Sequence, residues 1–133
     1  MKKINLESDL SIIMPCYNEV NGLLRSVNNL RKELPGAEII IVDDCSIDGS
    51  DKVIAKIKNV KSVTHEFNKG YGAALKTGMK LAKRRYIAWF DADNEHKASD
   101  LKKMHNIISK GGIVGVIGSR TSSTSGLRSF GKT

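Results

Sequence analysis

Short apolar runs alternate with segments of helical spacing along most of this chain. The clearest run spans 38–42, where Ile39, Ile40 and Ile41 are adjacent and leave no alternation of apolar and polar positions. A continuous β-branched run is typical of a strand that is buried on both faces, as in a parallel sheet covered by helices. Four other runs are expected to form strands: 10–14, 60–66, 86–90 and 113–117.

Between these runs, apolar residues recur three and four positions apart, which is the spacing of an amphipathic helix. The expected helices include the segments 20–34, 53–57, 72–83 and 101–108. Asn18 is the expected N-cap of the first helix, and Asp48 or Ser50 that of the second. This repeated alternation of strand and helix predicts the α/β class, with a mainly parallel sheet and helices on both faces.

The size and composition of the chain fit one compact domain. It has 133 residues, 40% of them hydrophobic, which suffices for one core but not for two ordinary domains. No apolar stretch approaches the ~20 residues of a membrane span, and the N-terminus lacks the apolar region of a signal peptide. Cys16 and Cys45 give no disulfide framework. We therefore expect a reduced, cytoplasmic setting, with peripheral attachment to the cytoplasmic membrane face as an alternative.

The net charge of +8 is concentrated in the later part of the chain. Residues 1–50 carry a net charge of −3, and residues 51–133 one of +11. Such asymmetry occurs in proteins that bind nucleic acid or anionic membranes, although solvated lysines on helix faces also produce it. The few aromatic residues are not interleaved with the basic ones, so there is no sign of a stacking surface for single strands. We expect no nucleic-acid partner.

Polar clusters follow four of the predicted strands. In a mainly parallel sheet, ligands bind beyond the carboxyl ends of the strands, at the point where the strand order reverses. The clusters occupy 15–19, 43–46, 91–93 and 118–120. Their positions predict one shared binding site at that edge of the sheet.

The segment Asp91-Ala92-Asp93 is the most informative of these clusters. Two carboxylates one residue apart at a strand end can hold a divalent cation together with the phosphates of a ligand. Mg²⁺ suits such a site because it takes one or two protein carboxylates and completes its shell with waters and substrate oxygens. Two acidic residues in a turn are often simply solvated, so the inference depends on their position between a strand and a later helix.

A glycine-rich segment, 70–75, offers another interpretation because it is similar to a dinucleotide-binding fingerprint. That fingerprint has a third glycine and follows the first strand of its βαβ unit. Here Leu75 stands at the third glycine position, and the segment follows the weakest predicted strand. The sequence therefore disfavours a dinucleotide site.

Five segments, taken in order, resemble the motifs of one enzyme family: SIIMPCYNE, IIIVDDCSIDGS, NKGYGAALKTGMKLA, YIAWFDADNEH and VIGSR. They resemble the inverting family 2 nucleotide-sugar glycosyltransferases of the GT-A fold, close to the dolichyl-phosphate mannose and glucose synthases. The resemblance covers 10–120. It implies a glycosyltransferase that uses a nucleoside-diphosphate sugar as donor, and it leaves both GDP-mannose and UDP-glucose open.

The resemblance implies a set of residues that bind the nucleotide sugar. They are Pro15, Tyr17, Glu19, Val42, Asp44, Asp91, Ala92, Asp93 and Arg120. Asp44 would accept hydrogen bonds from the base, and Arg120 would contact the phosphates or the sugar through its planar set of donors. The loop 68–72 would lie near the diphosphate.

The resemblance also implies a divalent metal ion, Mg²⁺ or Mn²⁺. Asp91, Asp93 and Glu95 would hold it, mainly through Asp93. Close relatives often have glutamine at the position of Glu95, so a carboxylate there adds negative charge near the ion. His96 follows directly and is expected to orient the loop instead of binding the ion.

The acceptor and the catalytic base stay open at this point. No catalytic base is identified within this chain, since relatives carry theirs on the acceptor side. A hydroxyl acceptor requires a carboxylate base, whereas a lipid phosphate, such as a polyprenyl phosphate at a membrane surface, is already anionic and requires none. Two alternatives are a catalytically incomplete nucleotide-binding fragment and a basic interaction module.

We expect the chain to contain only the donor-binding part of the family fold. Residues 1–120 would form a nucleotide-sugar-binding half truncated on the acceptor side, and 121–133 a flexible tail rich in serine and threonine. The segment 127–133 looks too short to pack as an element. The predicted strand at 113–117 would then have an exposed apolar edge, which predicts a homodimer or larger assembly.

Overall fold

The computed structural model describes residues 9–93, 96–110, 115–118 and 127–130. The chain divides into two compact units, Met1–His96 and Lys97–Thr133, and each is described by itself. Of the helices in the described part of the chain, none is both long and apolar enough to cross a membrane. The first unit contains β1 (Leu10–Cys16), α1 (Leu23–Glu33), β2 (Glu38–Asp43), α2 (Ser50–Lys56), β3 (Lys61–Thr64), α3 (Tyr71–Leu81) and β4 (Tyr86–Trp89).

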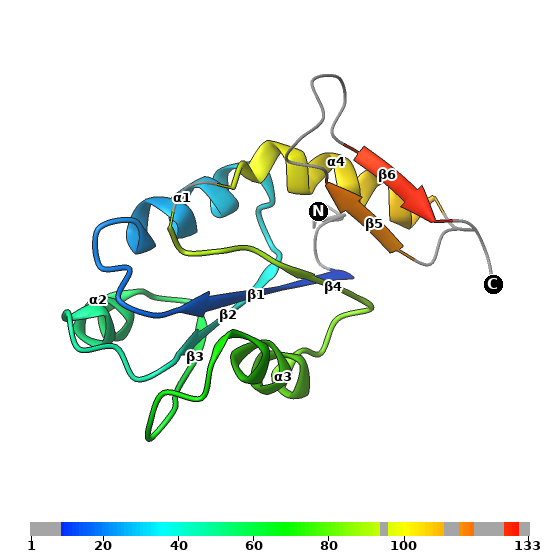
Figure 1. Cartoon of the computed structure of the whole chain (residues 1–133). Coiled ribbons are helices and arrows are strands. Elements are labelled where there is room, and N and C mark those ends of the chain that lie inside the picture. Colours follow the sequence, from blue (N-terminus) through cyan, green and yellow to red (C-terminus); the bar gives the residue numbers. More distant parts are fainter. Residues whose placement is uncertain (1–8, 94–95, 111–114, 119–126, 131–133) are drawn as a thin grey trace. The chain divides into compact units, whose positions relative to one another are not determined.

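The four strands of the first unit are parallel and lie in the order β3-β2-β1-β4 (Figure 1). The chain runs from β1 through β2 to β3, and then returns across the sheet to place β4 on the other side of β1. The helices α1 and α2 contact each other, and α3 lies on the opposite face of the sheet from α1. The predicted α/β class, with a mainly parallel sheet and helices on both faces, is confirmed. The strand order reverses between β1 and β4.

The core of the first unit lies on both sides of β1 and β2. In β2, Ile40 and Val42 face α3 and pack in one cluster with Ile13 and Ala74. Alternate residues of a strand point to opposite faces, so Ile41 points toward the face covered by α1. All of these side chains are buried, as the continuous β-branched run of β2 predicts.

On the face of the sheet toward α1, the helix buries its apolar stripe, formed by Leu23, Val27 and Leu30. On the other face, α3 approaches β1 closely because Gly78 has no side chain. A Cβ atom at this position would collide with the side chain of Ile13. The two helices therefore hold the sheet from both sides.

The second unit contains α4 (Ala98–Ser109), β5 (Gly115–Gly118) and β6 (Leu127–Phe130). The strands β5 and β6 pair antiparallel in a sheet of their own. Two expectations are therefore wrong: the last apolar run does not join the parallel sheet, and 127–133 is not too short to form an element. An antiparallel pair needs no crossover helix between its strands, so a short segment such as β6 can pair with β5.

The expected N-caps of α1 and α2 are also wrong. α1 begins at Leu23 with Gly22 as its N-cap, and α2 has Gly49 at that position. Asn18 instead has a φ of +53°. Its side-chain oxygen accepts a hydrogen bond from the N–H of Ile47 at 2.9 Å. Asn18 therefore fastens the loop after β1 to the loop after β2.

Candidate functional site

A cleft of about 430 Å³ lies at the carboxyl ends of the strands in the first unit, where the order reverses between β1 and β4. This is the place at which an open α/β sheet binds its ligands. Three polar segments meet there, from the ends of β1, β2 and β4, and the loop before α3 joins them. The lining residues are Pro15, Cys16, Tyr17, Glu19, Asp44, Asn68, Gly70, Tyr71, Ala74, Asp91, Ala92 and Asp93.

Seven of the nine residues predicted to bind the nucleotide sugar line this cleft: Pro15, Tyr17, Glu19, Asp44, Asp91, Ala92 and Asp93. Val42 is fully buried in β2, two residues before Asp44, and is not among the lining residues. Arg120 and the predicted metal ligand Glu95 lie outside the described residues. The structure therefore brings together the predicted residues of three strand ends.

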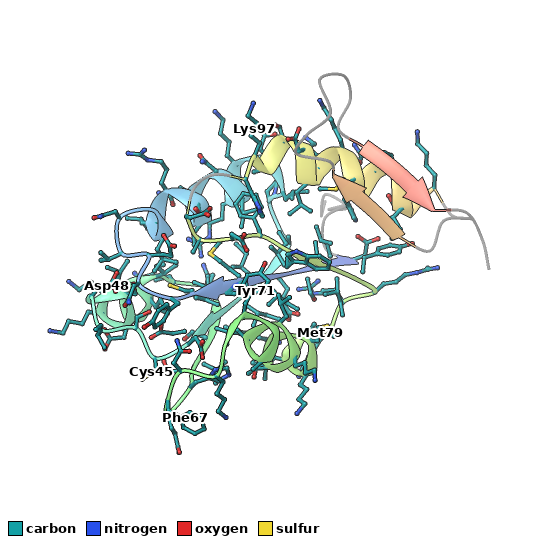
Figure 2. All side chains as sticks on the ribbon, viewed as in Figure 1. Cys45, Asp48, Phe67, Tyr71, Met79 and Lys97 are labelled. Carbon is teal, nitrogen blue, oxygen red and sulfur yellow. The ribbon has the colours of Figure 1, made fainter. Side chains whose placement is uncertain are left out.

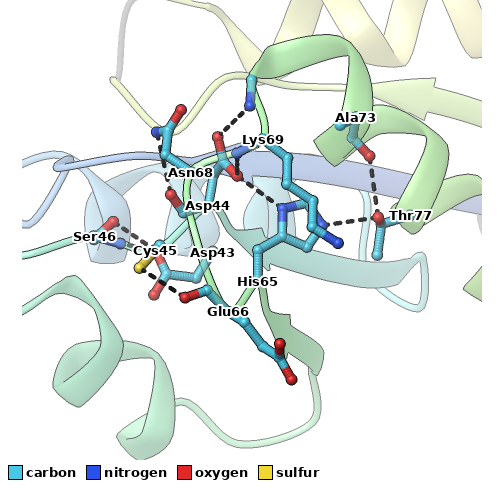
Figure 3. A network of polar contacts seen from close by, with 11 residues as sticks. Asp43, Asp44, Cys45, Ser46, His65, Glu66, Asn68, Lys69, Ala73 and Thr77 are labelled. Carbon is cyan, nitrogen blue, oxygen red and sulfur yellow. Dashed lines mark hydrogen bonds and ion pairs between the residues drawn. The ribbon is translucent and has the colours of Figure 1, made fainter.

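Asp44 lies at the centre of a network of hydrogen bonds in the cleft (Figure 3). Its Oδ1 accepts the N–H of Lys69 at 2.8 Å, and its Oδ2 accepts the N–H of Gly70 at 2.9 Å. Burial alone would raise the pKa of Asp44, but these two donors together with His65 outweigh it and hold the pKa below its ordinary value. The carboxylate is thus ionised and fixes the loop before α3.

His65 extends this network to α3. Its Nδ1 lies 2.7 Å from Oδ1 of Asp44, and its Nε2 lies 2.8 Å from the hydroxyl of Thr77. Because an ionised carboxylate only accepts, Nδ1 of His65 donates to Asp44. The hydroxyl of Thr77, which Nε2 contacts, also lies 3.0 Å from the carbonyl oxygen of Ala73. His65 therefore links Asp44, after β2, to α3.

Asp91 is held by two side chains at the other end of the cleft. The Tyr71 hydroxyl donates to Oδ1 of Asp91 at 2.7 Å. The N–H of Asp91 donates to Nδ1 of His96 at 3.2 Å, so the ring proton lies on Nε2, which is 3.4 Å from Oδ2 of Asp91. His96 therefore contacts the loop that carries Asp91 through both ring nitrogens.

The acidic pair of the cleft has the chemistry of a divalent metal site. Asp91 and Asp93 both supply carboxylate oxygens, the donors that Mg²⁺ and Mn²⁺ prefer, and both line the cleft. Among the described residues no group of three or more histidine, cysteine, aspartate or glutamate side chains could hold an ion. An ion held by this pair would need further ligands from outside the described residues, from water or from a bound ligand.

Cys16 lies at the base of the cleft and is buried. Burial, reinforced by the nearby Asp43 carboxylate, raises the pKa of Cys16 to about 11. The thiol is therefore protonated near neutral pH and is not an activated nucleophile. Both Cys16 and Cys45 are free cysteines.

Sequence reasoning missed three residues that shape the site. Tyr71 was visible only as part of a glycine-rich segment, and His65 had no local signal because its partner Asp44 is 21 residues away. Gly22, the N-cap of α1, lies against the acidic loop: a Cβ there would be 2.8 Å from the carbonyl oxygen of Ala92. Such a close approach of two backbones explains why a glycine stands at position 22, but the sequence alone does not show that the two backbones meet.

Comparison with known proteins gives relatives along nearly the whole chain. The family model described as glycosyl transferase family 2 matches residues 11–133. The uncharacterized protein MJ1222 of Methanocaldococcus jannaschii is 35% identical over 129 residues, which cover 90% of this chain and 52% of that protein. The UDP-N-acetylglucosamine–dolichyl-phosphate N-acetylglucosaminyltransferase of Methanococcus voltae is 33% identical over 128 residues, covering 82% of this chain and 51% of that enzyme.

A solved structure agrees with the fold. The mannosyltransferase PcManGT from Pyrobaculum calidifontis, in complex with GDP-Man and Mn²⁺, matches with a TM-score of 0.67 and 22% identity, over 86% of this chain and 36% of that one. At this identity the likeness concerns the fold alone, which is of the GT-A type. The chain spans about half the length of the two curated relatives it matches here. By the family model, which matches most of its length, the chain belongs to glycosyl transferase family 2.

Proposed function

We propose that the cleft binds a nucleoside-diphosphate sugar together with a divalent metal ion, and that the chain is the donor-binding part of a glycosyltransferase. The observation that supports this most strongly is the meeting of three strand ends at one cleft, with Asp44 on one side and the pair Asp91 and Asp93 on the other. The cleft volume of about 430 Å³ is within the range of small-ligand sites.

In this proposal the Asp44 carboxylate accepts a hydrogen bond from the nucleobase. This carboxylate already accepts two backbone N–H groups and His65, and a carboxylate has about four acceptor positions. One position is therefore left for an N–H group of a nucleobase. Tyr17, which is 48% exposed at the end of β1, offers an aromatic face to the nucleoside.

Asp91 and Asp93 would hold the metal ion at the end of the cleft proposed for the diphosphate. When bound, Mg²⁺ or Mn²⁺ would neutralise the charge that develops on the departing nucleoside diphosphate. The Tyr71 hydroxyl donates to the Asp91 carboxylate. Glu95 is proposed as a further ligand of the metal ion, and Arg120 as a contact of the phosphates or the sugar.

A polyprenyl phosphate is the acceptor that we propose, with GDP-mannose and UDP-glucose as the two candidate donors. The name of the Methanococcus voltae relative includes a dolichyl-phosphate acceptor, which supports the lipid phosphate. A phosphate oxygen is already anionic and attacks without a general base. With this acceptor, the proposed site of the reaction is the cytoplasmic surface of a membrane.

A second candidate is nucleotide binding without turnover. It is favoured by one observation: the chain spans only 52% and 51% of the length of the two relatives. Both candidates predict metal-dependent binding of UDP or GDP. They differ only in whether the sugar is transferred to an acceptor.

A transfer assay separates the two candidates. The chain is incubated with radiolabelled GDP-mannose or UDP-glucose, Mn²⁺ and polyprenyl phosphate in detergent, and the lipid product is extracted and counted. We expect label in the lipid with one of the two donors and none with the Asp93→Asn variant. Binding without any lipid product would support the nucleotide-binding candidate, and the absence of both would contradict the proposed function.

A further inference from the structure

Three consecutive residues contact two carboxylates that belong to different strand ends. The N–H groups of Lys69 and Gly70 donate to Asp44 after β2, at 2.8 and 2.9 Å. The next residue, Tyr71, donates its hydroxyl to Asp91 after β4 at 2.7 Å. Tyr71 is the first residue of α3, at the start of that helix in Figure 2. The segment 69–71 therefore joins the Asp44 side of the cleft to the Asp91 side.

We propose that Tyr71 is a positioning residue for Asp91: its hydroxyl holds the carboxylate in the orientation that binds the metal ion, and the segment 69–71 fixes its distance from Asp44. The inference rests on the proposed function and adds to it a residue that acts through Asp91 instead of through the ligand. The resemblance to family 2 implies only that the loop 68–72 lies near the diphosphate, and the contact with Asp91 gives Tyr71 a role of its own.

The hydroxyl of Tyr71 is the donor in this contact. A carboxylate only accepts hydrogen bonds, so the phenol donates to Oδ1 of Asp91. Each carboxylate oxygen has two lone pairs, so Oδ1 could accept from the phenol and still take part in holding a metal ion.

A carboxylate that binds metal is commonly held by a hydrogen bond of this kind. Removing such an outer partner usually weakens metal binding 10- to 100-fold, because the ligand loses its orientation. Asp91 has one partner on each oxygen, Tyr71 on Oδ1 and His96 on Oδ2 at 3.4 Å. Tyr71 provides the shorter contact, so it is expected to have the larger effect.

Tyr71→Phe is the direct test, since it removes only the hydroxyl from a half-exposed side chain. Free Mn²⁺ is followed by its electron paramagnetic resonance signal while the full chain is titrated in the presence of saturating UDP, and separately of saturating GDP. We expect Mn²⁺ to bind about 10- to 100-fold more weakly to the variant. Tyr86→Phe, a tyrosine of β4 outside the cleft lining, is the matched control and should bind Mn²⁺ like the wild type.

A double-mutant cycle with Asp91→Ala shows whether Tyr71 acts through Asp91. If it does, adding Tyr71→Phe to Asp91→Ala causes no further loss, because Asp91→Ala has already removed the acceptor of the Tyr71 hydroxyl. Amide hydrogen exchange at Lys69 and Gly70 should stay slow in Tyr71→Phe, since their bonds to Asp44 do not involve the phenol. The affinity for UMP and GMP without metal should also be unchanged.

The outcomes are distinguishable. If the wild-type chain binds neither nucleoside diphosphate with Mn²⁺, the proposed function fails and this inference fails with it. If the wild type binds one of them and Tyr71→Phe binds Mn²⁺ equally well, only the inference on Tyr71 is overturned. The inference is likewise overturned if the metal-free affinity for UMP and GMP falls as much as the Mn²⁺ affinity, because Tyr71 would then contact the ligand or support the whole loop.

Discussion

Gly22 and Ala92 lie in backbone contact: a methyl group on the α-carbon of Gly22 would be 2.8 Å from the carbonyl oxygen of Ala92. It would also be 3.1 Å from the carbonyl carbon of Asp93. Because both neighbours are backbone atoms, they cannot turn aside as a flexible side chain would. The N-terminus of α1 therefore sets the position of the acidic loop.

Gly22→Ala should displace the loop that carries Asp91 and Asp93. We expect a loss of about 1–3 kcal/mol in the free energy of unfolding, the usual cost of forcing atoms into a packed site, and weaker metal-dependent binding of UDP or GDP. Denaturant unfolding and calorimetric titration measure the two effects.

Gly72→Ala is the matched control, because a Cβ there meets nothing within 4 Å. This change should stabilise α3 by up to about 1 kcal/mol. Equal stability of the Gly22 variant and the wild type would contradict the account.

Asp44→Asn should loosen the loop before α3. The amide group of asparagine has one acceptor oxygen, whereas the carboxylate accepts from Lys69, Gly70 and His65 on two oxygens. We expect a loss of about 1–3 kcal/mol in unfolding free energy and faster amide hydrogen exchange at Lys69 and Gly70. Exchange that stays as slow as in the wild type would show that Asp44 does not hold this loop.

Glu38 should make the stability depend on pH. Burial alone would raise its pKa, but the ion pair with Lys61 and the hydrogen bonds from Lys83 and Ser11 lower it from 4.5 to about 2. A lowered pKa means that the stabilisation is complete above pH 4.5 and is lost as the pH falls toward 2.

Glu38→Gln should therefore lower the unfolding free energy at pH 7 by about 1–3 kcal/mol, and the difference from the wild type should shrink as the pH falls below 4.5. Urea unfolding at several pH values measures this. Glu66→Gln, at an exposed position, should have little effect at any pH. A difference that stays constant down to pH 2.5 would exclude Glu38 as the source.

The sequence predicts self-association through the edge of the strand at 113–117, and the exposed apolar side of β4 is a second surface where we now expect it. Ile87 and Trp89 are 46% and 55% exposed. Within the described residues, β4 pairs with β1 along one edge only. Light scattering should give a mass above that of one chain at high concentration, and replacing both residues with lysine should restore the monomer mass. A wild-type chain that stays monomeric throughout would rule this association out.

The strands that carry the cleft could be predicted from the sequence because their signals are local. The β-branched run at Ile39–Ile41 predicts a strand buried on both faces, and the rule for parallel sheets brings Asp44 and Asp91 to one edge. By contrast, asparagine is a common N-cap residue, yet the side chain of Asn18 accepts its hydrogen bond from Ile47 in another loop. A propensity for capping does not show which of two hydrogen-bond partners a side chain takes.

The contacts of Tyr71 and Gly22 could not be predicted, because they depend on how α3 and α1 are oriented on the sheet. Tyr71 reaches Asp91 only because α3 starts beside the end of β4. The strand β6 was missed for a related reason. Leu127 and Phe130 form too short an apolar pattern to indicate a strand, and the segment is a strand because it pairs with β5.

Thermal unfolding of the chain with UDP and with GDP, each with and without Mn²⁺, tests the central claim most directly. A ligand present at about 100 times its Kd adds about 2.7 kcal/mol, which raises the midpoint of a domain this size by about 5–10 °C. We predict such a rise with one of the two nucleotides, only when Mn²⁺ is present, and its loss in Asp93→Asn. A midpoint that neither nucleotide moves, with or without Mn²⁺, would contradict a donor site at the ends of β1, β2 and β4.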